Sequence, residues 1–263
     1  MLVINQGPII INTEMQNVKN EKWFSTDDIT NYKNNINKDI WKNEDITYNF
    51  NSLGYRTIEL ENIDNTDFVL TFGCSYTEGV GLHTHQIWNH YIKEYTNYQL
   101  FNAAKEATGI DVQTYNSMCW IQSLLPMPKL VVIQWPHKSR KSFATKTEEG
   151  VALIDNCENL STRDGVWWTK RYIVDESEMN LNVLMQFELA NYAWAKHNVP
   201  VLNFSWDEDL EPVLINSKFK LHYMPYGNSD RARDGIHDGP ISHLKTANHI
   251  IELLKLGNFT YKI

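Results

Sequence analysis

Residues 68–81 read FVLTFGCSYTEGVG, and this stretch decides the fold. It begins with a short apolar, β-prone run, and the residues after it carry apolar side chains at helical spacing, namely Ile87, Tyr91 and Ile92. The sequence therefore predicts a strand that passes through a glycine-bounded turn into a helix. Such a turn lifts the Ser75 hydroxyl out of the sheet and points it at solvent near a helix N-terminus, where anionic charge is stabilised.

Strand and helix candidates alternate along the rest of the chain. Strands are expected at 68–72, 98–102, 130–134 and 199–204, and helices at about 84–96, 110–124, 179–197 and 240–254. This alternation implies a parallel sheet covered on both faces, with ligands bound at the carboxyl ends of the strands. Ser75, Asn102 and Gln134 fall at or just after such ends. In the clearest helix, 179–197, the following apolar residues fall near one face: Leu181, Leu184, Met185, Leu189, Tyr192 and Ala195.

A second informative stretch, RDGIHDGP, occupies residues 233–240. It can supply His237 as a general base and Asp234 as the carboxylate that orients the imidazole and fixes its tautomer. Together with Ser75 as the nucleophile, these groups make the triad of acyl transfer, in which the base takes the proton of an otherwise inert alcohol.

Each of these residues also has a simpler interpretation. Ser75 stands three residues before Glu78, which is the spacing of a helix capping box. Asp234 can belong to an ordinary turn that leaves His237 exposed, and Asp238 is an alternative carboxylate to orient the imidazole. His243, on the helix that follows, either supports the site or lies on the surface.

The two stretches resemble blocks of the SGNH (GDSL) hydrolases. Gly73–Thr77 is similar to the first block, G-D-S-x-T, with Cys74 in the usual Asp position, and Asp234–His237 is similar to the last block, D-x-x-H. Asn51–Arg56 resembles a segment that often precedes the serine strand, and the resemblance extends roughly to Ile251. It implies a flavodoxin-like three-layer α/β/α sandwich with a parallel central sheet, and a serine esterase with the triad Ser75, Asp234 and His237.

The resemblance also implies an oxyanion hole. Its donors would be the backbone N–H of Ser75, the N–H of Gly109 and the side chain of Gln134, which stands where the family has an asparagine. Gly109 can alternatively just begin the following helix, and His137 or Arg140 can replace Gln134 as the donor. Losing one such donor typically costs about 10²–10³ in kcat. Trp135, His137 and Arg140 are the expected substrate contacts.

Composition narrows the class of partner and the compartment. The net charge of -8, with no run of Lys and Arg, argues against nucleic acid or an anionic membrane as partner. Three cysteines without metal-like spacing fit a reducing compartment. With neither a signal peptide nor a membrane span in view, we expect a cytoplasmic protein. No cofactor is expected, and no acidic residue or cysteine completes a metal site around His83, His85 and His90.

Chain length and composition also suggest the organisation and the substrate. The 263 residues and 42% hydrophobic content fit a single domain, residues 1–263. Residues 1–50 would be a polar extension anchored by Trp23 and Trp41, and residues 138–179 a surface insertion or a lid. We expect hydrolysis of a small-molecule or carbohydrate ester, because nine Trp and 13 Tyr suit stacking on sugar rings. Transfer of the acyl group to an acceptor and a catalytically inactive binding or structural module are the alternatives.

Overall fold

The computed structural model describes residues 2–4, 11–63, 67–147, 150–154, 176–224 and 230–257. A five-stranded parallel sheet with strand order β4-β3-β5-β8-β9 forms its centre. The strands are β3 (Phe68–Phe72), β4 (Gln99–Asn102), β5 (Leu130–Trp135), β8 (Val201–Ser205) and β9 (Leu221–Tyr223). The parallel sheet expected from the sequence is confirmed.

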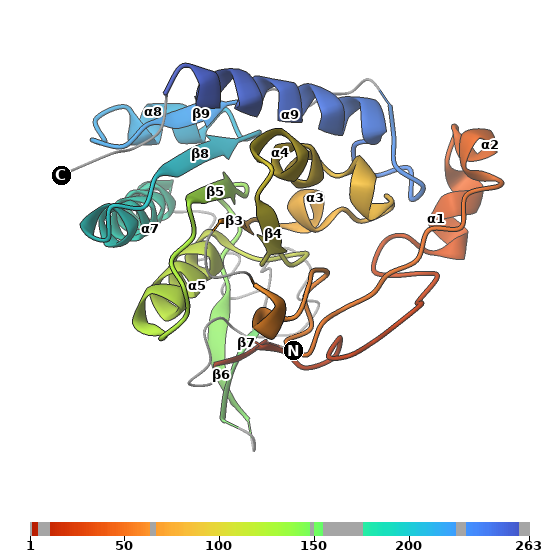
Figure 1. Ribbon diagram of the computed structural model, residues 1–263, viewed down its shortest axis with the longest axis horizontal. Coiled ribbons are helices and arrows are strands. Elements are labelled where there is room, and N and C mark those ends of the chain that lie inside the picture. Colours follow the sequence, from red (N-terminus) through yellow and green to blue (C-terminus); the bar gives the residue numbers. More distant parts are fainter. Residues whose placement is uncertain are drawn as a thin grey trace.

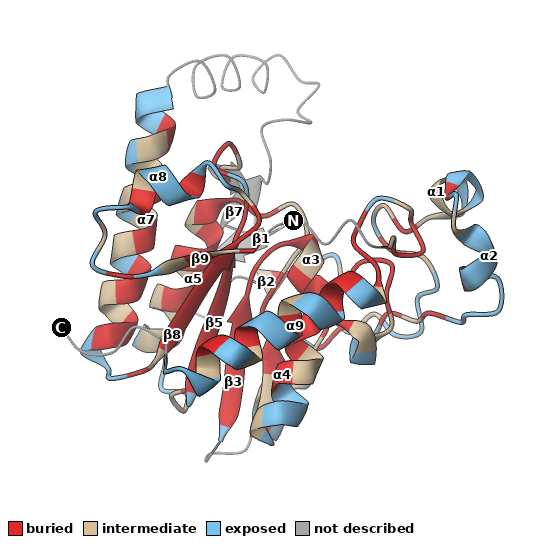
Figure 2. Ribbon diagram, turned by 90° about the horizontal axis from the view of Figure 1, so that it is seen from above, coloured by how far each residue is buried: buried red, intermediate tan, exposed pale blue. Residues whose placement is uncertain are grey.

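Four long helices cover the two faces of this sheet (Figure 1). One layer holds α4 (Trp88–Thr96) and α9 (Pro240–Lys255), and the other holds α5 (Ile110–Gln122) and α7 (Glu176–Lys196). Successive strand residues point to opposite layers. Leu70 and Ile133 therefore pack in the core beneath α5 and α7, whereas Val69 and Val132 pack in the core beneath α4 and α9. Figure 2 shows the strands buried along almost their whole length, as expected for a parallel sheet between two helical layers.

Short elements connect these layers. The helical ones are α1 (Ile29–Asn34), α2 (Lys38–Trp41), α3 (Ser75–Glu78), α8 (Leu210–Leu214) and the 3-10 turns Leu60–Asn62 and Thr84–Gln86. A separate antiparallel sheet, in the order β2-β1-β7-β6, consists of β1 (Leu2–Ile4), β2 (Ile11–Asn12), β6 (Phe143–Thr147) and β7 (Gly150–Ile154). The hairpin β6–β7 belongs to the expected insertion 138–179, and residues 155–175 of that insertion lie outside the described residues.

Two helices differ from the sequence expectation. The helix expected at 84–96 divides at Ile87, whose backbone is extended (φ -80°, ψ 141°), into a 3-10 turn and α4. In α7, three residues of the apolar stripe lie at the surface, with Leu181, Met185 and Leu189 at least half exposed. Phe187 and Trp194 are fully buried instead. The helix carries apolar residues on two faces, and the face with the large aromatic rings packs on the sheet.

Candidate active site

The turn after β3 presents Ser75 at the start of α3. Gly73 fits there because a Cβ atom at this position would lie 2.3 Å from Thr77 Oγ1. Gly79, with φ of +82°, ends the helix in a left-handed conformation that suits glycine. The N-cap position belongs to Cys74, which makes no side-chain capping bond. The interpretation of Ser75 as a capping residue is therefore wrong, and its hydroxyl is directed elsewhere.

The Ser75 hydroxyl contacts His237, which belongs to the loop that precedes α9. Ser75 Oγ lies 2.8 Å from His237 Nε2, and His237 Nδ1 lies 2.6 Å from Asp234 Oδ2. The other carboxylate oxygen of Asp234 accepts hydrogen bonds from the backbone N–H groups of Ile236 and His237, both at 3.0 Å. The His237 ring is nearly buried. Folding thus brings together the three side chains that the sequence selected, and the exposed-turn alternative for His237 is wrong.

The hydrogen bonds fix the charge on Asp234. Burial alone would raise the pKa of its carboxyl group, but the hydrogen bond and charge of His237, together with the two backbone N–H donors, outweigh burial and lower the pKa below its usual value. An ionised carboxylate at Nδ1 requires that nitrogen to carry a proton. The lone pair of Nε2 is then directed at the Ser75 hydroxyl, as a general base requires.

Neither Asp238 nor His243 enters this chain of contacts. Asp238 is buried and lies 3.5 Å from the Arg231 guanidinium, so Asp234 is the carboxylate that holds the imidazole. His243, on α9, accepts a hydrogen bond from the backbone N–H of Trp88 at 3.1 Å. Burial, together with the nearby His237, lowers the pKa of His243 to about 3, which keeps its ring neutral. His243 is therefore a buried residue that joins α9 to the start of α4.

The two other expected oxyanion donors are already engaged. The Gly109 N–H donates to Ser142 Oγ at 3.2 Å, and Gly109 is the N-cap of α5, as its alternative interpretation holds. The Gln134 amide oxygen accepts from the Cys74 backbone N–H at 3.0 Å and from the Cys74 thiol at 3.1 Å, while its Nε2 donates to the Trp135 carbonyl at 2.9 Å. Gln134 thus braces the turn that carries Ser75.

An open pocket of about 460 Å³ lies beside this site, at the carboxyl ends of β5, β8 and β9. Its wall includes the two neighbours of Ser75 in sequence and the expected contacts His137 and Arg140. The pocket also includes residues that the sequence did not indicate, namely Trp206, Asp207, Glu208, Asp209 and Tyr223. The end of the strand expected at 199–204 could have indicated Trp206, because ligands bind just beyond such ends.

The side chain of Trp135 is not the substrate contact expected from the sequence. Trp135 borders the pocket, but its indole is buried against Phe187 and donates to Asn203 Oδ1 at 2.9 Å, so the ring cannot stack on a ligand. Within the described ranges, no three His, Cys, Asp or Glu side chains gather where a metal ion could bind. His83 instead contacts Glu44 at 2.9 Å. Among all the residues that the structure describes, no helix is long and apolar enough to span a membrane.

Comparison with known proteins reveals a similar fold. No protein-family model matches the chain, and no curated protein does. Among solved structures, the acetyl xylan esterase Est2A from the rumen bacterium Butyrivibrio proteoclasticus is similar with a TM-score of 0.50 and 12% identity, over 73% of this chain and 65% of that chain. The structure of TesA has a TM-score of 0.47 and 14% identity, over 72% and 98% of the two chains.

The Butyrivibrio esterase is an SGNH hydrolase structure, and this chain shares its fold, a mostly parallel central sheet between helical layers. It spans just under two thirds of the length of the Butyrivibrio esterase. At 12% identity the likeness concerns the fold. The fold alone does not assign an activity, because one fold hosts many different functions.

Proposed function

We propose that this protein is a serine hydrolase that cleaves carboxylic esters through an acyl-Ser75 intermediate. The observation that carries the proposal is the continuous contact from Ser75 Oγ to His237 Nε2 (2.8 Å) and from His237 Nδ1 to Asp234 (2.6 Å). A span of 162 residues separates Ser75 from His237 in the sequence. Neither helix capping by Ser75 nor turn formation at Asp234 requires a contact between Ser75 and His237.

The proposed reaction has two steps. His237 Nε2 takes the proton of the Ser75 hydroxyl as Oγ attacks the ester carbonyl carbon, and the imidazolium then protonates the alcohol that leaves. Water subsequently attacks the acyl-Ser75 carbonyl while His237 accepts its proton and returns it to Ser75 Oγ, which releases the carboxylic acid. Asp234 stabilises the positive charge that develops on the imidazole in both steps.

Stabilisation of the oxyanion would begin at the Ser75 backbone N–H. This group lies in the first turn of α3, where backbone N–H groups have no acceptor within the helix. We infer that Arg140 supplies the second donor. Arg140 lines the pocket together with Cys74 and Tyr76, and the ion pairs among the described residues include none of its guanidinium. A preorganised donor of this kind acts on charge that develops during the reaction.

The pocket supports a polar substrate alcohol such as a sugar. Aromatic residues Tyr76, Trp206 and Tyr223 line it together with the acidic run 207–209. Rings of this kind can stack on a sugar, and carboxylates accept hydrogen bonds from sugar hydroxyls. An acetyl group on a carbohydrate would fit the proposal, and a carbohydrate acetyl ester is also the substrate in the name of the Butyrivibrio esterase.

A catalytically inactive binding module is the second candidate. The observation that favours it is the engagement of Gly109 and Gln134, the two further oxyanion donors expected, in bonds within the chain. An inactive protein of this fold would keep the pocket and bind a ligand without forming an acyl intermediate. The two candidates therefore differ in the reactivity of Ser75.

A fluorophosphonate probe and p-nitrophenyl acetate separate these candidates. The hydrolase is expected to form a covalent adduct on Ser75 and to release p-nitrophenol, and Ser75→Ala is expected to abolish both reactions. Ser123→Ala is the matched control, because the Ser123 hydroxyl bonds the Trp120 carbonyl at the far end of α5. A folded wild-type protein that neither reacts with the probe nor hydrolyses esters would support the binding module instead.

A further inference from the structure

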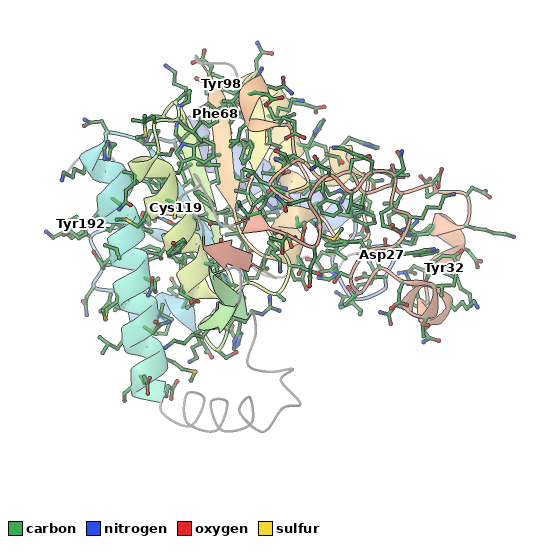
Figure 3. The ribbon with its side chains drawn as sticks, turned by 90° about the horizontal axis from the view of Figure 1, so that it is seen from below. Asp27, Tyr32, Phe68, Tyr98, Cys119 and Tyr192 are labelled. Atoms are coloured by element: carbon green, nitrogen blue, oxygen red, sulfur yellow. The ribbon has the colours of Figure 1, made fainter. Side chains whose placement is uncertain are left out.

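The segment of residues 22–41, which we call the N-terminal segment, binds the loop that carries Asp234 and His237. Figure 3 labels Asp27 and Tyr32 on it, to one side of the sheet, and Figure 1 shows α1 and α2 beside the loop that leads into α9. Its contacts reach four consecutive loop residues, 231–234. The segment thus contacts the catalytic loop far more closely than a surface extension would.

Two side chains of the N-terminal segment donate hydrogen bonds to backbone carbonyl groups of the loop. Trp41 Nε1 donates to the Arg231 carbonyl at 3.2 Å. Asn35 Nδ2 donates to the carbonyls of Ala232 and Arg233, at 2.8 and 3.1 Å. Asn35 and Trp41 are both buried, so these bonds are shielded from water and hold the loop backbone in one conformation.

A buried ion pair fixes the centre of the contact. The Asp27 carboxylate accepts from Arg233 Nε at 2.9 Å and from Arg233 Nη2 at 2.6 Å. The guanidinium lies 4.2 Å from the centroid of the Trp23 ring, and the Tyr48 hydroxyl donates a short hydrogen bond to the same carboxylate. With so many partners, Asp27 has little freedom to move, and neither has the residue before it.

The residue before Asp27 is Thr26, and it touches the triad. Thr26 Oγ1 donates to Asp234 Oδ2 at 2.8 Å. That is the oxygen that faces His237 Nδ1 at 2.6 Å. The Asp234 carboxylate therefore has donors on both oxygens, and Thr26 is the donor that comes from outside its own loop.

We propose that Thr26 is a positioning residue: its hydroxyl holds Asp234 Oδ2 against His237 Nδ1, and the Asp27–Arg233 ion pair holds Thr26 in place. This inference rests on the proposed function of Ser75. It gives the N-terminal segment a role in the reaction, because that segment supplies a fourth member to the chain of hydrogen bonds. Without the Thr26 donor, the carboxylate would rotate more freely and the imidazole would lose its alignment with Ser75.

The experiment compares Thr26→Val, which keeps the shape and deletes the donor, with Thr26→Ser, which keeps the donor. We expect Thr26→Val to lower kcat about 10-fold with KM unchanged within twofold, because a misaligned base slows the chemical step more than binding. Thr26→Ser should restore most of kcat. Thr96→Val is the matched control: Thr96 is also half-buried, and its hydroxyl bonds the Ile92 carbonyl at the end of α4.

Two further readouts separate positioning from a loss of stability. The His237 Nδ1 proton should give a downfield ¹H NMR resonance, which Thr26→Val should shift and Thr96→Val should leave in place. The acid limb of the kcat–pH profile should move to higher pH in Thr26→Val. When the Asp234 carboxylate loses one hydrogen-bond donor, its negative charge is less neutralised. It then stabilises the protonated form of the His237 imidazole more strongly.

Other charged and titratable groups near His237 remain unchanged in this comparison. From α9, the neutral His243 lies close enough to interact with it electrostatically, and from α3 the Tyr76 ring lies edge-on at 4.8 Å. The N-terminal segment contributes the Asp27 carboxylate, which is paired with Arg233 of the catalytic loop. All of them are present in the wild type and in each variant, so a shift of the acid limb is assigned to the Thr26 hydroxyl.

The outcomes distinguish this inference from the proposed function. If Thr26→Val matches Thr96→Val in kcat, in pH profile and in the NMR resonance, Thr26 has no positioning role. If the wild type does not hydrolyse esters or react with the fluorophosphonate, the proposed function fails. The resonance then decides alone whether Thr26 orients Asp234: a shift in Thr26→Val supports the contact as the orienting one, and an unchanged resonance overturns it.

Discussion

Asp27 and Arg233 form a buried ion pair although 206 residues separate them in the sequence. The pair joins the N-terminal segment to the loop of Asp234 and His237. Breaking a buried pair by removal of one partner leaves an uncompensated charge, which costs more than the pair itself contributes. The structure of the loop that carries Asp234 and His237 is therefore coupled to a segment that precedes the first strand of the central sheet.

Asp27→Ala is expected to lower the free energy of unfolding by about 3–5 kcal/mol, because Arg233 would stay buried without its carboxylate. Urea denaturation at pH 7 measures the loss. Asp67→Ala is the control, since Asp67 pairs with Lys129 at the surface and such a pair contributes about 0–1 kcal/mol. The double variant Asp27→Leu with Arg233→Met should recover much of the stability. A loss as small as that of Asp67→Ala would contradict the buried pair.

Gln134 should prove to be a structural residue of the nucleophile turn. Gln134→Met keeps the volume but leaves the buried Cys74 N–H without its acceptor, which costs about 1–3 kcal/mol. Unfolding free energy and kcat should therefore fall together. An oxyanion donor would behave differently, with kcat lower by about 10²–10³ and stability unchanged. Urea denaturation beside kinetics with p-nitrophenyl acetate separates the two roles.

The sequence revealed the fold because its main elements are long enough to show periodicity. β3 spans Phe68–Phe72 as expected, and α5 begins at Ile110 as expected. The strand β9 was missed because its three residues, Leu221–Tyr223, are too few to carry a pattern. Local sequence also leaves two apolar faces on α7, and only packing against the sheet decides between them.

The sequence also selected Ser75, Asp234 and His237, which are in contact in the structure, because each stands in a short motif of definite chemistry. It could not place Thr26, whose contact with Asp234 spans 208 residues and belongs to no motif. Gly109 and Gln134 were assigned by their position in a resemblance. Their donors depend on Ser142 and on the Trp135 carbonyl, which are features of the folded chain.

Asp234→Asn is expected to lower kcat by about 10⁴ while the fold is preserved. A neutral amide in place of the carboxylate favours the wrong imidazole tautomer and cannot stabilise the imidazolium. Asp238→Asn is the control, because Asp238 faces Arg231 rather than His237. Initial rates of ester hydrolysis measure both variants. A larger loss in Asp238→Asn than in Asp234→Asn would assign the orienting role to Asp238 after all.

Glu78 should make the protein less stable as the pH rises. Its side chain is fully buried, and its Oε1 atom has no hydrogen-bond partner among the described residues. Burial, with the nearby Glu106 carboxylate, raises the pKa of Glu78 to about 8, although Lys105, Arg56 and a backbone N–H at 2.6 Å oppose the shift. The folded state therefore holds a proton that the unfolded state, with an ordinary carboxyl pKa of 4.5, has lost.

The sign of the effect follows from linkage. Between pH 4.5 and 8 the folded protein binds more protons at Glu78 than the unfolded chain does, so stability at this position declines with rising pH by up to about 1.4 kcal/mol per unit. Glu78→Gln removes the titration and keeps an acceptor oxygen. Its stability relative to the wild type should increase steadily from pH 5 to pH 8 in urea denaturation.

Two comparisons make the pH experiment decisive. His243, with its pKa lowered to about 3, destabilises the fold as the pH falls from its ordinary pKa of 6.5 toward 3, but it does so equally in the wild type and in Glu78→Gln. The difference between the two proteins therefore isolates Glu78. Glu252→Gln, at an exposed position on α9, should follow the wild type at every pH. A constant difference between Glu78→Gln and the wild type from pH 5 to pH 8 would show that Glu78 is ionised in the folded state throughout.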